Sequence, residues 1–235
     1  IFVEKPLVAD WQISEFRKKF NNAEKIRIFI GYCLRYNKSL VALRDAVEGQ
    51  TCGELISIRA TCGQYLPSWR PNKDYRATVS AQKVLGGGAL LELSHEIDYL
   101  NWIFKGIAVH SSSVLNSGYL DIDVEDVVDI LGQTYDGASV NLHLDFVAKQ
   151  AQRNCTIVGE SGSVFWDFEQ STVTFYDGVD HKYLYRGTES DRDQMYIDML
   201  DDFLTVDAHK ITRAATVGSS LEVLEIIENT REAAN

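Results

Sequence analysis

The chain has 235 residues, of which 45% are hydrophobic and 24% charged, so it holds enough apolar material for a globular core. Its formal net charge of -11 argues against a nucleic-acid-binding protein, which needs a clustered basic face, and no apolar run approaches the ~20 residues of a membrane span. Four cysteines without metal-ligand spacing indicate reduced thiols in a cytoplasmic protein and no metal site.

The first fifty residues predict two strands and two helices. Residues 1–3 are typical of the end of a buried strand, which Glu4-Lys5-Pro6 closes, because Pro6 favours an extended conformation at the residue before it. Asp10 is a candidate N-cap for an amphipathic helix through about residue 22. The next two predicted elements are a strand at 25–34 and a helix at 37–50, with Asn37 or Ser39 as its cap and Gly49 at its end.

A predicted strand at 54–63 is followed by an irregular stretch at 64–85, rich in aromatic residues and arginines. Three glycines at 86–88 then lead into an apolar segment. We predict a helix that starts just after Gly88, because Leu93, Ile97 and Leu100 recur at helical spacing and should face a core.

From about residue 108 to 187 the pattern has period two, which predicts strands. Residues 139–146 alternate cleanly between apolar and polar, and turn signals such as Asp136-Gly137 and Asp177-Gly178 separate further β-rich runs. Helices are expected near 191–206 and 218–233. The fold class is therefore α+β, a large and mostly antiparallel sheet with helices on one face, the other face being polar or available to a partner.

Glu92, His95 and Asp98 recur at intervals of three in the predicted helix after Gly88, so they would lie within about 60° of a common line. A histidine beside carboxylates suits proton transfer near neutral pH. The alternative is a helix with a solvated polar face and an ordinary histidine. Glu-x-x-His is also half of a di-iron site, but the chain has no second copy, so we assign no metal.

Other candidates carry a weaker signal. Lys5, held extended by the following proline, could project into a ligand crevice, although a surface lysine in a turn is the commoner case. Arginines beside aromatic residues suit recognition of sugars, carboxylates or phosphates, or form an ordinary amphipathic rim. Arg153 and the strand residue His143 indicate only a solvated face.

In this order, "VEKPL", "GYCLRYN" and "LGGGALLELSHEIDYLNWIF" resemble the Gfo/Idh/MocA family of oxidoreductases, the group of glucose–fructose oxidoreductase and inositol dehydrogenase. The resemblance covers almost the whole chain. It implies an NAD- or NADP-dependent dehydrogenase or reductase that acts on a sugar, cyclitol or sugar nucleotide. It also implies a homodimer or homotetramer formed through the sheet.

The resemblance carries roles onto particular residues. Lys5 would lie beside the nicotinamide, and His95 would exchange a proton with the substrate hydroxyl. Glu92 stands three residues before that histidine, where the family commonly has its acidic residue four before, so its catalytic role is less regular. The implied cofactor contacts are Glu4, Lys5, Pro6 and Arg35. The implied substrate contacts are Tyr36, Trp69, Arg70, Tyr75, Arg76 and Asp98.

The resemblance also implies a domain organisation. Residues 1–22 would be the tail of a dinucleotide-binding Rossmann domain, 23–215 a substrate and oligomerisation domain, and 216–235 a final helix that returns to the Rossmann domain. Remnants of that domain would then lie at both chain ends. The glycine-rich phosphate turn is expected before residue 1, so the chain is expected to bind cofactor weakly or not at all. The alternative function is a non-catalytic ligand-binding or oligomerisation module.

Overall fold

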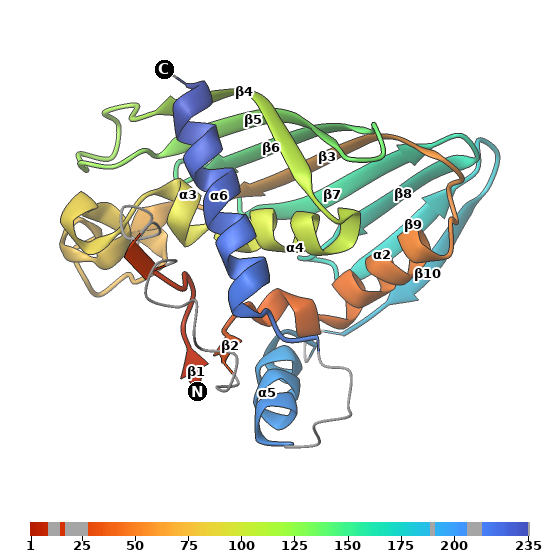
Figure 1. The fold of residues 1–235 in the computed structure, drawn as a ribbon, viewed down its shortest axis with the longest axis horizontal. Helices are drawn as coiled ribbons and strands as arrows, with labels where there is room; N and C mark the ends of the chain where they lie inside the picture. Colours follow the sequence, from red (N-terminus) through yellow and green to blue (C-terminus); the bar gives the residue numbers. More distant parts are fainter. Residues whose placement is uncertain (9–14, 17–27, 189–190, 206–212, 235) are drawn as a thin grey trace.

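An eight-stranded sheet with its helices gathered on one face makes up most of the molecule (Figure 1). The computed structural model describes residues 1–8, 15–16, 28–188, 191–205 and 213–234. The strand order is β10-β9-β8-β7-β3-β6-β5-β4. The strands are β3 (Leu55–Gly63), β4 (Ile107–Leu115), β5 (Val127–Thr134), β6 (Ser139–Asp145), β7 (Gln152–Gly159), β8 (Gly162–Asp167), β9 (Thr172–Tyr176) and β10 (His181–Arg186).

The predicted α+β class and the mostly antiparallel sheet are confirmed. Neighbouring strands pair antiparallel except β3 and β6, which pair in parallel at the centre of the sheet. The alternation predicted for 139–146 is confirmed as well, since Val140, Leu142 and Leu144 of β6 are buried on the helix-covered face. The turns at Asp136-Gly137 and Asp177-Gly178 join β5 to β6 and β9 to β10.

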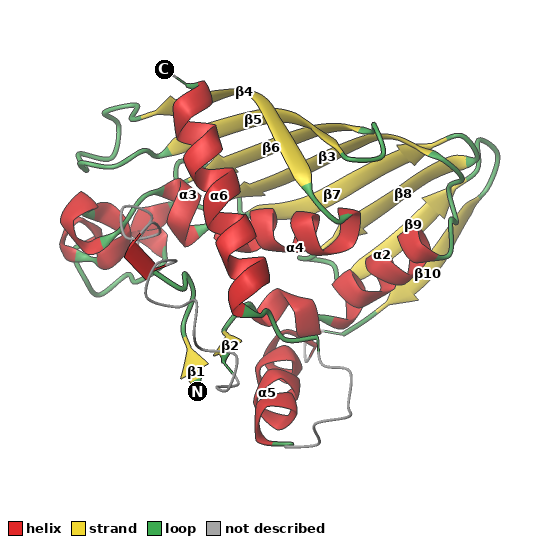
Figure 2. Cartoon of the chain, viewed as in Figure 1, coloured by secondary structure: helices red, strands yellow, loops and turns green. Residues whose placement is uncertain are grey.

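Most of the helices lie on the same face of the sheet, and α5 lies apart from it (Figure 2). Asn37 caps α2, as one of the two predicted candidates, because its side chain accepts a hydrogen bond from the backbone nitrogen of Leu40, and Gly49 follows the helix end. The helix α2 packs against β8, β9 and β10, whereas α6 packs along β4 and α4. The α-helices are α2 (Lys38–Glu48), α3 (Ala89–Glu92), α4 (Ser94–Phe104), α5 (Asp191–Leu204) and α6 (Val217–Ala233). No described helix is long and apolar enough to span a membrane.

A second, two-stranded sheet joins segments from both ends of the chain. Its strands β1 (Phe2–Val3) and β2 (Phe29–Ile30) pair in parallel, and the backbone nitrogen of Ile30 donates to the carbonyl of Ala215, just before α6. The predicted strand at 25–34 is wrong beyond Ile30. Two tight turns follow it, with Tyr32 bonded to Ile30 and Cys33 bonded to Gly31, and a 3₁₀-helix, η2, spans Cys33–Tyr36. Most of the helix predicted from Asp10 lies outside the described residues.

The helix predicted after Gly88 is interrupted. The break falls at Leu93, whose φ of -95° and ψ of 21° end α3 and precede the first residue of α4. The expectation of a single helix that carries Glu92, His95 and Asp98 is therefore wrong, because Glu92 ends α3 whereas His95 and Asp98 belong to α4.

Close packing explains the glycines at this entry. A Cβ on Gly87 would overlap the backbone of Val79 and Ser80. Gly88 has a φ of 109°, and a Cβ there would overlap the Glu125 carboxylate. The glycines thus let the chain pass between a 3₁₀ turn and the loop that precedes β5.

Candidate active site

Lys5 and His95, which are far apart in the sequence, come together at the junction of α3 and α4. The Lys5 Nζ donates a hydrogen bond of 2.7 Å to the backbone carbonyl of Glu92. The charge on Lys5 is close enough to His95 to act on its titration. The His95 ring packs edge-on against Tyr32, with ring centroids 5.5 Å apart. Three segments that are distant in sequence thus meet around one imidazole.

The surroundings of His95 hold it neutral. Burial lowers the pKa of His95 well below 6.5, and the positive charges of Lys5 and Arg153 lower it further. Its Nδ1 is buried and has no hydrogen-bond partner among the described residues. A neutral imidazole with an unused ring nitrogen can accept a proton from a group placed beside it.

The residues Glu92, Glu4 and Pro6, which were also predicted for this site, differ in their contacts and exposure. Glu92 reaches Lys5 through its backbone carbonyl, so that contact does not depend on its carboxylate. Glu4 is exposed, and its carboxylate approaches Gly31. Pro6 is half-buried and follows a cis peptide bond.

The structure pairs Arg35, predicted as a cofactor contact, with Asp98, predicted as a substrate contact. The Arg35 Nε and Nη2 donate to the two Asp98 oxygens at 2.9 and 2.7 Å, and the Arg35 and Asp98 side chains are 5% and 0% exposed. This forked pair joins η2 to α4. Tyr36 is also buried, and its hydroxyl donates to Asp202 of α5 at 2.6 Å.

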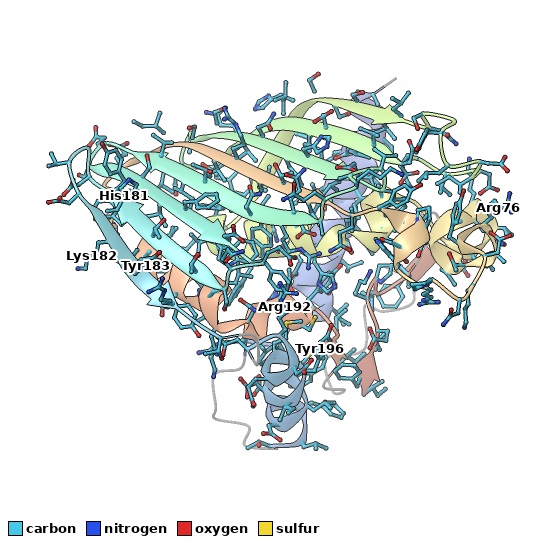
Figure 3. The ribbon with its side chains drawn as sticks, turned by 180° about the vertical axis from the view of Figure 1, so that it is seen from behind. Arg76, His181, Lys182, Tyr183, Arg192 and Tyr196 are labelled. Atoms are coloured by element: carbon cyan, nitrogen blue, oxygen red, sulfur yellow. The ribbon has the colours of Figure 1, made fainter. Side chains whose placement is uncertain are left out.

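The predicted aromatic and arginine stretch divides into two groups. Trp69, Arg70 and Tyr75 line one small hollow, and Trp69 packs edge-on against Phe146. Arg76 is exposed and pairs with Asp74 and Asp121. Figure 3 shows Arg76 at the edge of the molecule, well away from Tyr196 of α5.

Sequence reasoning missed a buried ion pair beside His95. Arg153 Nε of β7 lies 2.7 Å from Glu96 Oε1 of α4, and the Arg153 and Glu96 side chains are 11% and 0% exposed. The prediction of a solvated Arg153 is therefore wrong. The signal was present: Arg153 has the strand parity of the buried residue Cys155, and Glu96 lies three residues after the buried Leu93.

His143 lies on the uncovered face of the sheet between two carboxylates. Its Nδ1 is 2.7 Å from Asp129 Oδ1, and its Nε2 is 3.2 Å from Asp145 Oδ2. Hydrogen bonds and charge from Asp145 and Asp129 raise the pKa of His143 to about 9. The strand register places Asp129 directly opposite His143, which is why these side chains meet.

A cavity of about 500 Å³ lies away from His95, between the C-terminal ends of α2 and α4 and the start of β3. It is lined by residues such as Glu48, Glu54 and Lys105. Among the described residues, no group of three or more His, Cys, Asp or Glu side chains is arranged to hold a metal ion.

Comparison with known proteins gives a family and a set of similar folds. The profile of the GFO/IDH/MocA C-terminal domain matches residues 40–165. No curated protein matches the sequence. Among solved structures, levoglucosan dehydrogenase in complex with NADH and levoglucosan superposes with a TM-score of 0.81 at 17% identity, covering 100% of this chain and 71% of that one.

Two further structures are similar. An inositol dehydrogenase homologue from Azotobacter vinelandii, complexed with NAD+, has a TM-score of 0.76 at 14% identity, covering 99% of this chain and 69% of its own. UDP-N-acetylglucosamine 3-dehydrogenase from Acidithiobacillus ferrooxidans has a TM-score of 0.71 at 14% identity, with coverages of 99% and 69%. At these identities the structural likeness concerns the fold.

Proposed function

Because this chain belongs to the GFO/IDH/MocA family, we propose that it is the substrate-side part of an NAD(P)-dependent oxidoreductase that acts on a hydroxyl group of a sugar-like molecule. The observation that carries the proposal is the meeting of Lys5 with a half-buried, neutral His95. The names of three similar structures support the substrate class, since they are dehydrogenases of polyhydroxylated compounds or a homologue of one.

The residues fit one side of such a reaction. His95, which its depressed pKa keeps neutral, takes the proton of the substrate hydroxyl during oxidation and returns it during reduction. Lys5, fixed by the Glu92 carbonyl, holds the substrate oxygen with its ammonium group and stabilises negative charge as it develops there. A nicotinamide cofactor held on the Lys5 side would supply the acceptor or donor of the hydride for the carbon that bears this hydroxyl.

The contacts assigned to the cofactor and the substrate stay part of the proposal. Glu4, Pro6 and Arg35 are proposed on the cofactor side. On the substrate side, Trp69, Arg70 and Tyr75 stay proposed contacts, and the hollow that they line, about 10 Å³, is too small to enclose a sugar by itself. Tyr36 and Asp98 act by supporting that side, since their polar atoms bond to Asp202 and Arg35.

The test is dinucleotide-dependent oxidation of a panel of sugars, cyclitols and sugar nucleotides by the full-length protein. We expect His95→Ala to lower kcat by about 10²- to 10⁴-fold, the usual contribution of a general acid–base. The matched control is His110→Ala, because His110 is exposed on β4. A full-length enzyme whose turnover is unchanged by His95→Ala would contradict the assigned role.

The open face of the sheet favours a second, non-exclusive role in self-association. Leu131 and Phe165 remain 50% and 38% exposed on β5 and β8. We propose that a second copy covers this face, forming a dimer or tetramer. Sedimentation of the double variant Leu131→Lys with Phe165→Lys should then give a smaller species. A wild type that sediments as a monomer would favour a different partner for this face. A wild-type oligomer without activity would favour a non-catalytic module.

A further inference from the structure

The ion pair between Arg153 and Glu96 is unusual in its setting. Glu96 is fully buried, directly follows His95 in the chain, and neither of its oxygens has an aligned hydrogen-bond partner among the described residues. Its contact with Arg153 is therefore mainly electrostatic. A carboxylate in such a place costs stability unless a positive charge stays beside it.

Arg153 is held from several sides. Its guanidinium lies 5.2 Å from the ring centroid of Phe168, and the Cys62 thiol is close enough to act on its titration. Arg153 belongs to β7, whereas Glu96 belongs to the first turn of α4. The pair thus crosses from the sheet to the helix that carries His95.

We propose that Arg153 and Glu96 form a positioning pair that ties the first turn of α4 to the sheet and sets the electric field at His95. This inference deepens the proposed function and rests on it. The pair acts on the reaction through the imidazole, so that His95 stays neutral and ready to accept a proton. In this arrangement Glu96 keeps Arg153 at its place, and Arg153 opposes the protonation of His95.

The charged and titratable groups that face His95 come from each surrounding segment. Lys5 lies on the segment after β1, Tyr32 precedes η2, and Arg153 comes from β7. Lys5 and Arg153 both oppose protonation of the imidazole, and Glu96 offsets part of the Arg153 charge. Removal of Arg153 and removal of Glu96 should consequently shift His95 in opposite directions.

The test is the titration of His95 by NMR in the full-length protein with isotope-labelled histidine. The chain has five histidines, and the His95 signal is identified by its loss in His95→Gln. We expect Arg153→Met to raise the His95 pKa by about one to two units, because the cation that opposes protonation of the imidazole is removed. Glu96→Gln should leave His95 neutral throughout the range in which the protein is folded.

One further variant and an internal control keep the test decisive. Arg153→Lys retains the charge, so His95 should titrate in this variant as in the wild type. This variant can be measured even if Arg153→Met fails to fold. His143, on the other face of the sheet, should titrate unchanged in all variants and serves as an internal control. A purely structural role predicts that Arg153→Met and Glu96→Gln expose His95 alike and raise its pKa together. That outcome, or no shift in either variant, would overturn the proposal.

Activity then separates this inference from the proposed function. In an active full-length enzyme, Arg153→Met should shift the acidic limb of the plot of kcat against pH to higher pH by the same one to two units. KM should change less than threefold. If the wild type oxidises no substrate of the panel, the proposed function fails, while the NMR titration still decides on the positioning pair.

Discussion

The two faces of the eight-stranded sheet each carry a basic side chain beside carboxylates, and they differ in what surrounds these charges. On the helix-covered face, Arg153 and Glu96 are sealed from solvent next to His95. On the open face, His143 keeps 31% of its side chain exposed between Asp129 and Asp145. Burial strengthens the electrostatic coupling on the first face, and solvent screens it on the second. The comparison indicates that the covered face is where charge can tune a reaction.

The strongest way to break this comparison is to remove one member of a sealed pair. Asp98→Ala leaves the Arg35 guanidinium buried without its carboxylate, so we expect a loss of about 3–5 kcal/mol in the free energy of unfolding. Urea denaturation measures it. The control is Asp74→Ala, which removes the exposed partner of Arg76 and should leave the unfolding midpoint unchanged. Equal effects of the two variants would remove the distinction between sealed and open pairs.

A second prediction compares neighbouring positions of one strand. Ile157 of β7 is fully buried on the covered face, so Ile157→Ala should destabilise the protein by about 2–4 kcal/mol. Thr156 directly precedes Ile157 and points to the open face, where truncation to alanine should change stability by less than about 0.5 kcal/mol. Thermal unfolding of both variants checks this. A larger loss for Thr156→Ala would show that a partner covers the open face.

The smallest effect concerns pH. Since the folded-state pKa of His143 is about 9 and the ordinary value is 6.5, its contribution to stability is complete below about pH 6.5 and is lost as the pH rises through about 9. The amount should be about 1 kcal/mol, because the group is partly solvated. His143→Gln should flatten the fall in unfolding free energy between pH 6.5 and 9. If the unfolding free energy falls with pH as steeply in the variant as in the wild type, a group other than His143 causes the fall.

The sequence was most informative where local chemistry decides the structure. The Asn37 cap, the hairpin turns and the alternation in β6 depend on residues close in the chain, and each prediction was confirmed. The break at Leu93 could not be predicted, because it depends on how α3 packs between the glycine entry and the sheet. The partners of Arg153 and Asp98 were missed for a related reason. Periodicity shows which face a residue occupies, but not which distant charge it meets there.

The parallel pair of β3 and β6 has a consequence for folding. Parallel neighbours require a long crossover, and here residues 64–138 form it, with α3, α4 and the two edge-ward strands β4 and β5 inside. The centre of the sheet can therefore close only after this segment is in place, which is entropically costly and late. Amide hydrogens of β3, β6 and α4 should consequently exchange as one cooperative unit, so that α4 opens only when the whole sheet does.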